Sequence, residues 1–162
     1  MEQITSLTIE NFLTFRKPVT LALANQGLVL IVGDNRVSKA LSSNGVGKSA
    51  LTDALSWAFF DETIRGKKHE EIANRHTPGQ LTKVEVVGTD KDGNPWSITR
   101  CARPWAANLT WNGDRWDNKG CDGVIEDFLG FGFRTFRAGA VFGQGNFKRF
   151  SAADPEEQLR VF

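Results

Sequence analysis

Alternating apolar and polar residues at the start of the chain predict paired β-strands. Residues 4–12 alternate around Leu7 and Ile9, and residues 19–24 repeat the alternation after a turn at residues 15–18. A period of two is typical of strands that bury one face and expose the other. The two segments therefore predict a β-hairpin or meander.

A continuous apolar run at residues 28–32 follows a tight turn at residues 25–27. A run without polar alternation is typical of a strand buried on both faces. From Ser49 onward the apolar period becomes that of a helix. The apolar positions of this predicted helix are Leu51, Ala54, Leu55, Ala58 and Phe59.

The middle of the chain predicts a second group of antiparallel strands. Residues 83–89 and 96–101 alternate on either side of a turn-forming segment at residues 90–95. Residues 109–111 add a third short strand. We expect an antiparallel β-subdomain rich in tryptophan.

The last third of the chain mixes helical and strand patterns. An amphipathic pattern closed by Gly130 predicts a short helix. Residues 131–137 are aromatic and basic, residues 138–142 form a short apolar run typical of a strand, and residues 154–157 have the capping pattern of a helix start.

The overall composition is that of an ordinary globular protein. The chain has 162 residues, of which 40% are hydrophobic and 24% charged, and its formal net charge is +1. This length predicts one domain over residues 1–162, and the small net charge restricts any nucleic-acid contact to local basic patches. Cys101 and Cys121 have no metal or redox spacing, and no membrane-length apolar run or signal peptide occurs. We therefore expect a cytoplasmic protein with incidental or buried thiols.

The loop before the predicted helix has the pattern of a phosphate-binding site. Residues 44–49 read NGVGKS. Glycines allow successive backbone N–H groups to point at an anion, and the helix dipole adds positive charge at the same place. Lys48 would face the β- and γ-phosphates of a nucleotide, and Ser49 would offer a hydroxyl to Mg²⁺. The alternative is an ordinary glycine-rich turn between a strand and a helix.

This loop departs from the strict P-loop spacing, which requires glycine where the chain has Ser42. Residues 33–35 read GDN, but residues 36–43 separate them from residues 44–49. Joining the two parts through a single asparagine would give GDNGVGKS, a complete P-loop. We therefore interpret residues 36–43 as an insertion.

Two further features allow a nucleic-acid interpretation. A basic cluster at residues 65–69 is either a solvated loop or a contact to DNA or phosphate. Tryptophans near arginines either pack across strands or stack on bases. The residues concerned are Trp96, Trp105, Trp111, Trp116, Arg100, Arg103 and Arg115. His69 and His76 lack partners at metal-binding spacing and are expected on the surface.

Taken together, the motifs resemble the N-terminal lobe of an SMC-like, ABC-type ATPase head of the SbcC kind. SbcC-like proteins are the ATPase subunits of nuclease complexes that process DNA ends. The matching pieces are Asn11 and Phe12, the loop residues 33–35 and 44–49, the helix end WAFF at residues 57–60, and VFGQGNFKRF at residues 141–150, which is similar to the family's Q-loop. The resemblance covers nearly the whole chain, and the insertion at residues 36–43 leans towards phage-type members. It implies an α/β fold with a mixed sheet around the P-loop helix and an antiparallel β-subdomain.

The resemblance also implies ATP and Mg²⁺ as cofactors. Gln144 would contact Mg²⁺ or the attacking water beside the γ-phosphate, because a neutral amide can bind water without adding charge. Lys48 and Gln144 would then be the catalytic residues, and Ser49 and Gln144 the metal contacts. The nucleotide-binding residues implied are Asn35, Asn44, Gly45, Val46, Gly47, Lys48, Ser49 and Ala50. The alternative for Gln144 is a structural loop glutamine.

Several parts of such a head have no counterpart in this sequence. No apolar strand ends in Asp-Glu, no Ser-Gly-Gly signature occurs, and no long heptad run is present. In the family these parts follow later, so we expect half of a head that does not hydrolyse ATP by itself. The implied partners are a C-terminal lobe of the same or a second ATPase chain, an SbcD-like metallonuclease, DNA and a second ATP-bound head, with no membrane.

Three functions are compatible with this pattern. The first is the ATP-binding half of a head that regulates a DNA exonuclease or endonuclease in recombination, repair or phage DNA processing. The second is a head lobe of another SMC-like ATPase of the RecF, RecN or defence type. The third is a non-catalytic nucleotide-binding module that occupies a partner's lobe. The segment from Gln144 to Phe150 favours the first.

Overall fold

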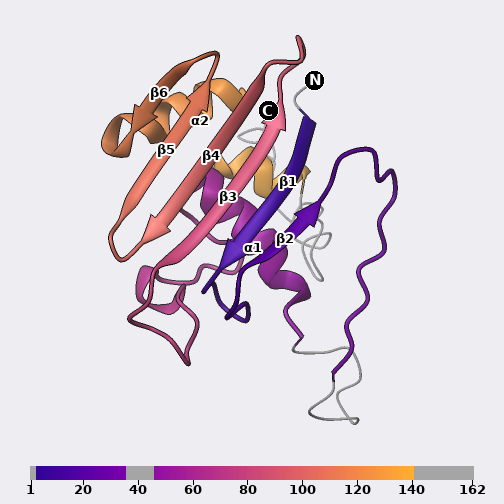
Figure 1. Ribbon diagram of the computed structural model, residues 1–162, viewed down its shortest axis with the longest axis vertical. Coiled ribbons are helices and arrows are strands. Elements are labelled where there is room, and N and C mark those ends of the chain that lie inside the picture. Colours follow the sequence, from indigo (N-terminus) through magenta and orange to yellow (C-terminus); the bar gives the residue numbers. More distant parts are fainter. Residues whose placement is uncertain (1–2, 36–45, 141–162) are drawn as a thin grey trace, which may run out of the picture.

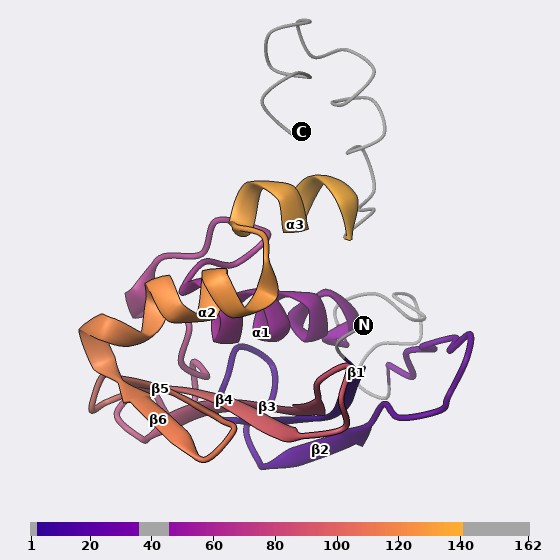
Figure 2. The ribbon, with the colours of Figure 1, turned by 90° about the horizontal axis from the view of Figure 1, so that it is seen from above.

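The computed structural model describes residues 3–35 and 46–140. In this part of the chain a single antiparallel sheet is covered on one face by helices (Figures 1 and 2). Its strands are β1 Gln3–Glu10, β2 Val19–Ala22, β3 Thr82–Thr89, β4 Pro95–Ala102, β5 Ala106–Trp111 and β6 Asp114–Asp117. The helices are α1 Lys48–Phe60, α2 Cys121–Leu129 and α3 Phe133–Gly139, with 3-10 turns η2 His69–Glu71 and η3 Asn118–Gly120.

The sheet has the strand order β2-β1-β3-β4-β5-β6. The predicted hairpin or meander at the start of the chain is confirmed, because β1 pairs with β2 with Leu7 opposite Leu21. The predicted hairpin around residues 90–95 is also confirmed, with Thr89 opposite Pro95. However, β1 also pairs with β3, so the expected β-subdomain is continuous with the first strands and is not a separate sheet.

Asp90 holds the turn between β3 and β4. Its carboxylate accepts hydrogen bonds from the backbone N–H groups of Asp92 and Asn94, each at 2.9 Å, and from Nε1 of Trp111 at 3.0 Å. These donors, Trp111 first, hold the pKa of Asp90 well below its usual range because they stabilise the ionised form. The contact with Trp111 also ties this turn to β5.

Helix α1 packs on β3 and β4 beside α2, which packs on β5 and β6, and α3 lies over α1 (Figure 2). Ala54, Ala58 and Phe59 are buried as the helical period predicts, while Leu51 and Leu55 are partly buried against the same core. Trp57 is also fully buried and packs on Phe12. A helix enclosed on two sides is held mainly by tertiary packing, since isolated helices of this length are marginal.

Arg100 fastens the C-terminal end of α1 to β4 and α2. Its side chain is only 5% exposed, and its Nε donates to the carbonyl oxygen of Ala58 at 3.3 Å. Its Nη2 contacts Oδ1 of Asp122 at 2.6 Å, and its Nη1 lies 3.8 Å from Oδ1 of Asp61. The side chain of Arg100 therefore stabilises the packing of β4 against α1 and α2. It is not an exposed arginine beside a tryptophan that could stack on a base.

The predicted strand at residues 28–32 is wrong for the described structure. These residues form no strand and run outside the sheet on the β2 side (Figure 1). Their side chains are 51–102% exposed. A buried strand needs sheet neighbours and a covered face, and the described residues supply neither to this run. Of the mixed sheet expected around the P-loop helix, the described residues therefore form only the antiparallel strands.

The predictions for the last third are corrected in part. The predicted helix is confirmed as α2, which ends at Gly130 in the left-handed region with a φ of 75°. The segment read only as aromatic and basic forms α3, and its helical residues include 138 and 139, so the strand predicted at residues 138–142 is wrong there. Residues 141 and 142 lie outside the described part. Phe136 of α3 packs on Phe59 and Phe60, and this tertiary contact favours a helix over the local strand pattern.

Strand β6 was not predicted, and it follows a turn at Asn112 and Gly113. Both turn residues have positive φ, 55° and 84°, which is typical of a tight hairpin turn. Strand β6 follows with Leu109 opposite Trp116. The third predicted strand is confirmed as β5, which begins at Ala106 and is longer than expected.

The two cysteines are free thiols, as expected. Cys121 is buried at the start of α2, and burial raises the pKa of its thiol to about 11. Burial also raises the pKa of the Cys101 thiol. Neither has the lowered pKa of a reactive cysteine. In the described residues, no helix has the length and apolar character needed to cross a membrane.

Candidate nucleotide-binding site

The N-terminus of α1 is built from the described half of the glycine-containing loop. Gly47 is the N-cap residue, with φ 97° and ψ 8°, and Lys48 is the first helical residue. The hydroxyl-bearing Ser49 is exposed, whereas Ala50 is buried against the core. Gly47 has no side chain that could cap this end, and no acidic residue lies in the first turn. The positive end of the helix dipole is therefore not balanced by a carboxylate of its own first turn, which suits an anion.

A turn after β1 packs against this helix start. A Cβ atom placed on Gly47 would lie 2.4 Å from Oγ1 of Thr14 and 3.8 Å from Cζ of Phe15. Only glycine permits this close approach together with the positive φ. Residues 15–18 were predicted only as a turn, and Thr14 was not predicted to neighbour the candidate phosphate-binding loop.

Hydrogen bonds from a distant loop hold the turn in place. The backbone N–H of Leu13 donates to the carbonyl of Ile72 at 2.7 Å, and Nδ2 of Asn74 donates to the carbonyl of Leu13 at 2.7 Å. Asn11, buried and in the left-handed region with a φ of 49°, donates through Nδ2 to the carbonyls of Thr77 and Gln80 at 3.1 and 3.0 Å. The motif residue Asn11 thus has a positioning role: it fixes the loop that supports Thr14.

Gly47→Ala should weaken ATP binding at least about tenfold and destabilise the fold. The alanine must adopt a left-handed φ, which costs about 1–2 kcal/mol, and its Cβ must displace Thr14. Titration with a fluorescent ATP analogue measures the affinity, and urea unfolding measures the stability.

Gly66→Ala is the matched control, because Gly66 has a φ of 66° but nothing within 4 Å of an added Cβ. It should lose similar stability and keep its ATP affinity. Adding Thr14→Ala to Gly47→Ala should recover part of the binding by removing the clashing hydroxyl. Equal ATP affinity in Gly47→Ala and wild type would contradict the proposed location of the phosphates.

The remaining predicted site residues are only partly within the described structure. Val46, Gly47, Lys48, Ser49 and Ala50 are contiguous at the start of α1, with Lys48 partly buried. Asn35 lies at the end of the described segment that contains residues 28–32. Asn44, Gly45 and Gln144 lie outside the described residues.

The fit of this site differs between phosphate and Mg²⁺. A helix N-terminus, a lysine and a glycine-containing loop suit a phosphate. For Mg²⁺, Ser49 offers one hydroxyl, and the described residues contain no group of three or more potential His, Cys, Asp or Glu ligands. Any Mg²⁺ held here would take its other ligands from the nucleotide, from water and from parts outside this description.

The basic cluster at residues 65–69 is mostly engaged with the protein itself. Nε of Arg65 lies 2.5 Å from Oδ2 of Asp53, a carboxylate that is fully buried in α1. Nζ of Lys67 lies 3.2 Å from Oε1 of Glu71. Arg65 therefore closes the loop onto α1, and the solvated-loop interpretation fits these two residues better than a phosphate contact. His69 and His76 are exposed, as expected.

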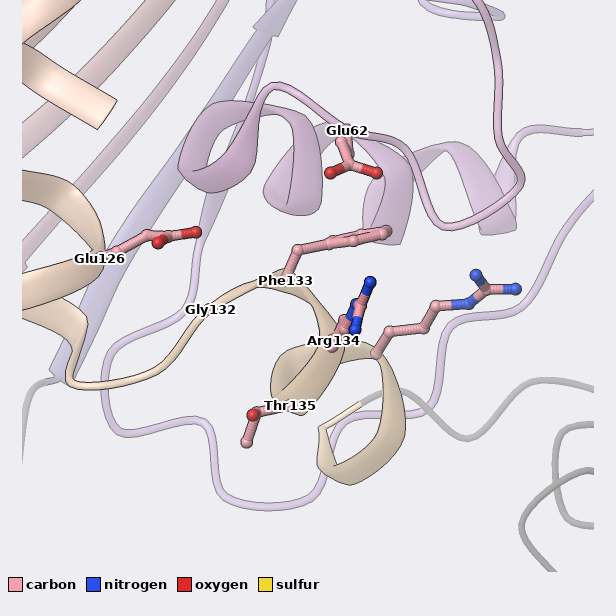
Figure 3. Close-up of a pocket in the computed structure, with 7 residues that line it drawn as sticks. Glu62, Glu126, Gly132, Phe133, Arg134 and Thr135 are labelled. Carbon is pink, nitrogen blue, oxygen red and sulfur yellow. The ribbon is translucent and has the colours of Figure 1, made fainter. Parts of the chain in front are cut away.

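An open pocket of about 570 Å³ lies beside α3 (Figure 3). Its lining includes the carboxylates of Glu62 and Glu126 and the guanidinium groups of Arg134 and Arg137, with Phe133 between Glu62 and Arg134 in this view. Glu62 follows the C-terminal end of α1, at the opposite end of the helix from Lys48. The lining of the pocket includes none of the described nucleotide-site residues. Its two carboxylates and two guanidinium groups have balanced charges.

Comparisons with known proteins show which family the chain is similar to. A family model described as "AAA domain" matches residues 6–162. The chain is 28% identical to the chromosome partition protein Smc of Methylococcus capsulatus over 176 aligned residues, covering 98% of this chain and 14% of that protein. It is 26% identical to the SbcC component of the nuclease SbcCD from Deinococcus radiodurans over 167 aligned residues, covering 96% and 17%.

Solved structures show the same fold. The SMC head domain from Thermotoga maritima has a TM-score of 0.55 at 21% identity, covering 94% of this chain and 51% of that one. The recombination mediator RecF bound to ATP has a TM-score of 0.56 at 21% identity, covering 76% and 30%. The chain spans about 14–17% of the length of the two curated relatives above. It belongs to the AAA domain family, and its fold is that of an N-terminal lobe of an SbcC-like, SMC-type ATPase head.

Proposed function

We propose that this chain is the ATP-binding half of an SMC-like ATPase head that regulates a DNA nuclease. In this function, residues 44–49 hold the triphosphate of ATP, and a C-terminal lobe of the same or a second chain completes the hydrolytic site. ATP bound there supplies a γ-phosphate whose hydrolysis drives the change between paired and separated heads. An SbcD-like metallonuclease and DNA are the further partners.

The exposed apolar run at residues 28–32 is the observation that supports a second lobe. Leu28 is 102% exposed and Leu30 86% exposed, whereas outside this run Leu81 is the only exposed large aliphatic residue among those that the structure describes. Burying one such side chain contributes about 1.5–3 kcal/mol, so leaving the whole run in water is unfavourable. The run directly precedes residues 33–49 of the P-loop in the sequence. A lobe that covers the run would therefore also lie next to the bound nucleotide.

The named relatives support DNA as the setting of this activity. Smc is a chromosome partition protein, and the SbcC relative is part of a nuclease. A second candidate function is a head lobe of the RecF type, favoured by the fold similarity to ATP-bound RecF. Copurification of the full chain with a metallonuclease from its own source supports the first function, whereas its absence under conditions that retain ATP binding supports the second.

Gln144→Ala tests the nuclease-regulating role. In a reconstituted head we expect ATP affinity to stay within about threefold, because a neutral amide adds little to the binding of a triphosphate. We expect hydrolysis to fall at least about tenfold, since the attacking water loses an orienting group. ATP-dependent DNA cleavage should fall with it.

Gln80→Ala is a suitable control for this variant, because Gln80 is an exposed glutamine in a loop of the described structure. Its ATP affinity, turnover and cleavage should match wild type. If Gln144→Ala also matches wild type in all three measurements, Gln144 has only a structural role and the assignment of a Q-loop is wrong.

A further inference from the structure

Trp105 differs from the other tryptophans of the chain in its exposure. Trp57 and Trp96 are buried, and Trp111 packs on Phe128 with ring centroids 5.0 Å apart. Trp105, in the turn between β4 and β5, is 50% exposed. The packing interpretation therefore holds for Trp96 and Trp111, and Trp116 is also partly buried against the core. Trp105 instead offers a large aromatic surface to solvent, which is unusual for this residue type.

The exposed ring of Trp105 is held in a defined position. The ring of His69 lies against it, with centroids 4.6 Å apart and an interplanar angle of 30°. The buried ring of Trp57 meets it edge-on at 6.4 Å. Nε2 of His69 in turn lies 3.4 Å from Oδ2 of Asp61, the residue that ends α1. Trp105 and His69 thus form a preorganised pair of rings, which reduces the entropy lost when a flat ligand stacks on it.

Two cations lie next to this ring pair in the sequence. Lys68 precedes His69, and Arg103 lies two positions before Trp105, both exposed. Unlike Arg65 and Lys67, neither takes part in an ion pair among the described residues. The backbone N–H of Lys68 donates to Oε2 of Glu71 at 3.1 Å, and this bond, together with the charges of Lys67 and Lys68, lowers the pKa of Glu71. The Nη1 group of Arg103 donates to the carbonyl of Pro78, and its remaining N–H groups are available for a phosphate.

We propose that the Trp105–His69 ring pair binds an unpaired base of a single-stranded nucleic acid, with Lys68 and Arg103 contacting its phosphates. The inference rests on DNA being a partner of the proposed function and adds the class of strand and the residues that meet it. Aromatic rings stack on any base that is unpaired, whereas the bases of a duplex are already stacked on each other.

The surroundings of the ring pair favour a nucleic acid over a protein partner. Apart from residues 28–32, Leu81 is the only other large exposed apolar side chain in the described part of the chain. Leu81 lies at the same end of the sheet, since the adjacent Thr82 pairs with Ala102. One leucine and one indole do not provide the apolar centre that protein interfaces use, whereas aromatic stacking next to cations is the usual basis of single-strand binding.

The test measures binding of the full chain to a fluorescent oligothymidylate of about 20 nucleotides and to a hairpin duplex of the same charge. Trp105→Ala should weaken single-strand binding about 5- to 100-fold, Trp105→Phe should stay within about threefold of wild type, and Leu81→Ala should change nothing. Two phosphate contacts predict a log–log salt slope of about −1.4 for the single strand. Thermal unfolding of each variant is the folding control.

The outcomes separate this inference from the proposed function. ATP affinity should be unchanged in Trp105→Ala, and single-strand affinity should be unchanged in Lys48→Ala. The inference is overturned if Trp105→Ala binds the single strand as wild type does, if duplex binding falls equally, or if wild type binds no single strand. It is also overturned if Trp105→Ala loses ATP affinity, because the ring then belongs to the nucleotide site. None of these results alters the Lys48 assignment.

Discussion

Lys48→Ala should lower ATP affinity at least about 10- to 100-fold, the loss expected when charge-assisted hydrogen bonds worth about 1.5–3 kcal/mol are removed. Lys48 is the first residue of α1, at the positive end of the helix dipole. A lysine at this position places a cation beside the β- and γ-phosphates, and the neighbouring Ser49 cannot replace its charge. Titration of wild type and variant with a fluorescent ATP analogue measures the difference.

Lys91→Ala is the matched control for this variant. Lys91 is exposed in the turn between β3 and β4, at the opposite end of the sheet from Thr14 and Phe15. It removes the same charge, so any general electrostatic effect on nucleotide affinity would appear in both variants. Unchanged ATP affinity in Lys48→Ala, with the fold intact by circular dichroism, would show that residues 44–49 are not a nucleotide site.

Much of the sheet and of α1 could be predicted because the information is local. Residues 4–12, 83–89 and 96–101 alternate with a period of two, and this pattern directly reflects one face packed on the helices and one face in water. The joining of both strand groups into one sheet was not predictable in the same way. It depends on pairing between Leu7 and Val86, which are far apart in the sequence.

The candidate site shows the same limit. The pattern NGVGKS predicts a phosphate-binding loop because glycine, lysine and serine at this spacing serve one chemistry. Thr14 could not be assigned to that site from its own residue type. Its place beside Gly47 follows from bonds that Asn74 and Ile72 make to Leu13, and no local pattern encodes such contacts.

The run at residues 28–32 was misread for a related reason. Its apolar composition favours burial, but composition does not say which molecule or lobe would provide the covering surface. In the described structure these residues are exposed and form no strand. We propose that a second lobe covers this run, and the next variant tests this.

Leu30→Asp should leave the chain itself nearly as stable as wild type but prevent assembly with the C-terminal lobe. Because Leu30 is 86% exposed, its replacement should change the free energy of unfolding by no more than about 0.5 kcal/mol. In an assembled head the same carboxylate would be buried without a partner, which is strongly unfavourable. Urea unfolding of the chain and its binding to the separately produced lobe are the two measurements.

Hydrolysis should follow assembly. We expect the chain by itself to hydrolyse ATP negligibly, because its sequence contains no apolar strand ending in Asp-Glu to bind Mg²⁺ and polarise water. Adding the C-terminal lobe should raise turnover at least about a hundredfold for wild type and for Leu81→Asp, a control that places the same charge at another exposed leucine. Leu30→Asp should show no such increase, although its ATP affinity stays near that of wild type.

Two results would contradict this account. Full turnover in assembled Leu30→Asp would show that residues 28–32 are not the contact with the second lobe. Lys48-dependent turnover by the chain alone would show that no second lobe is required.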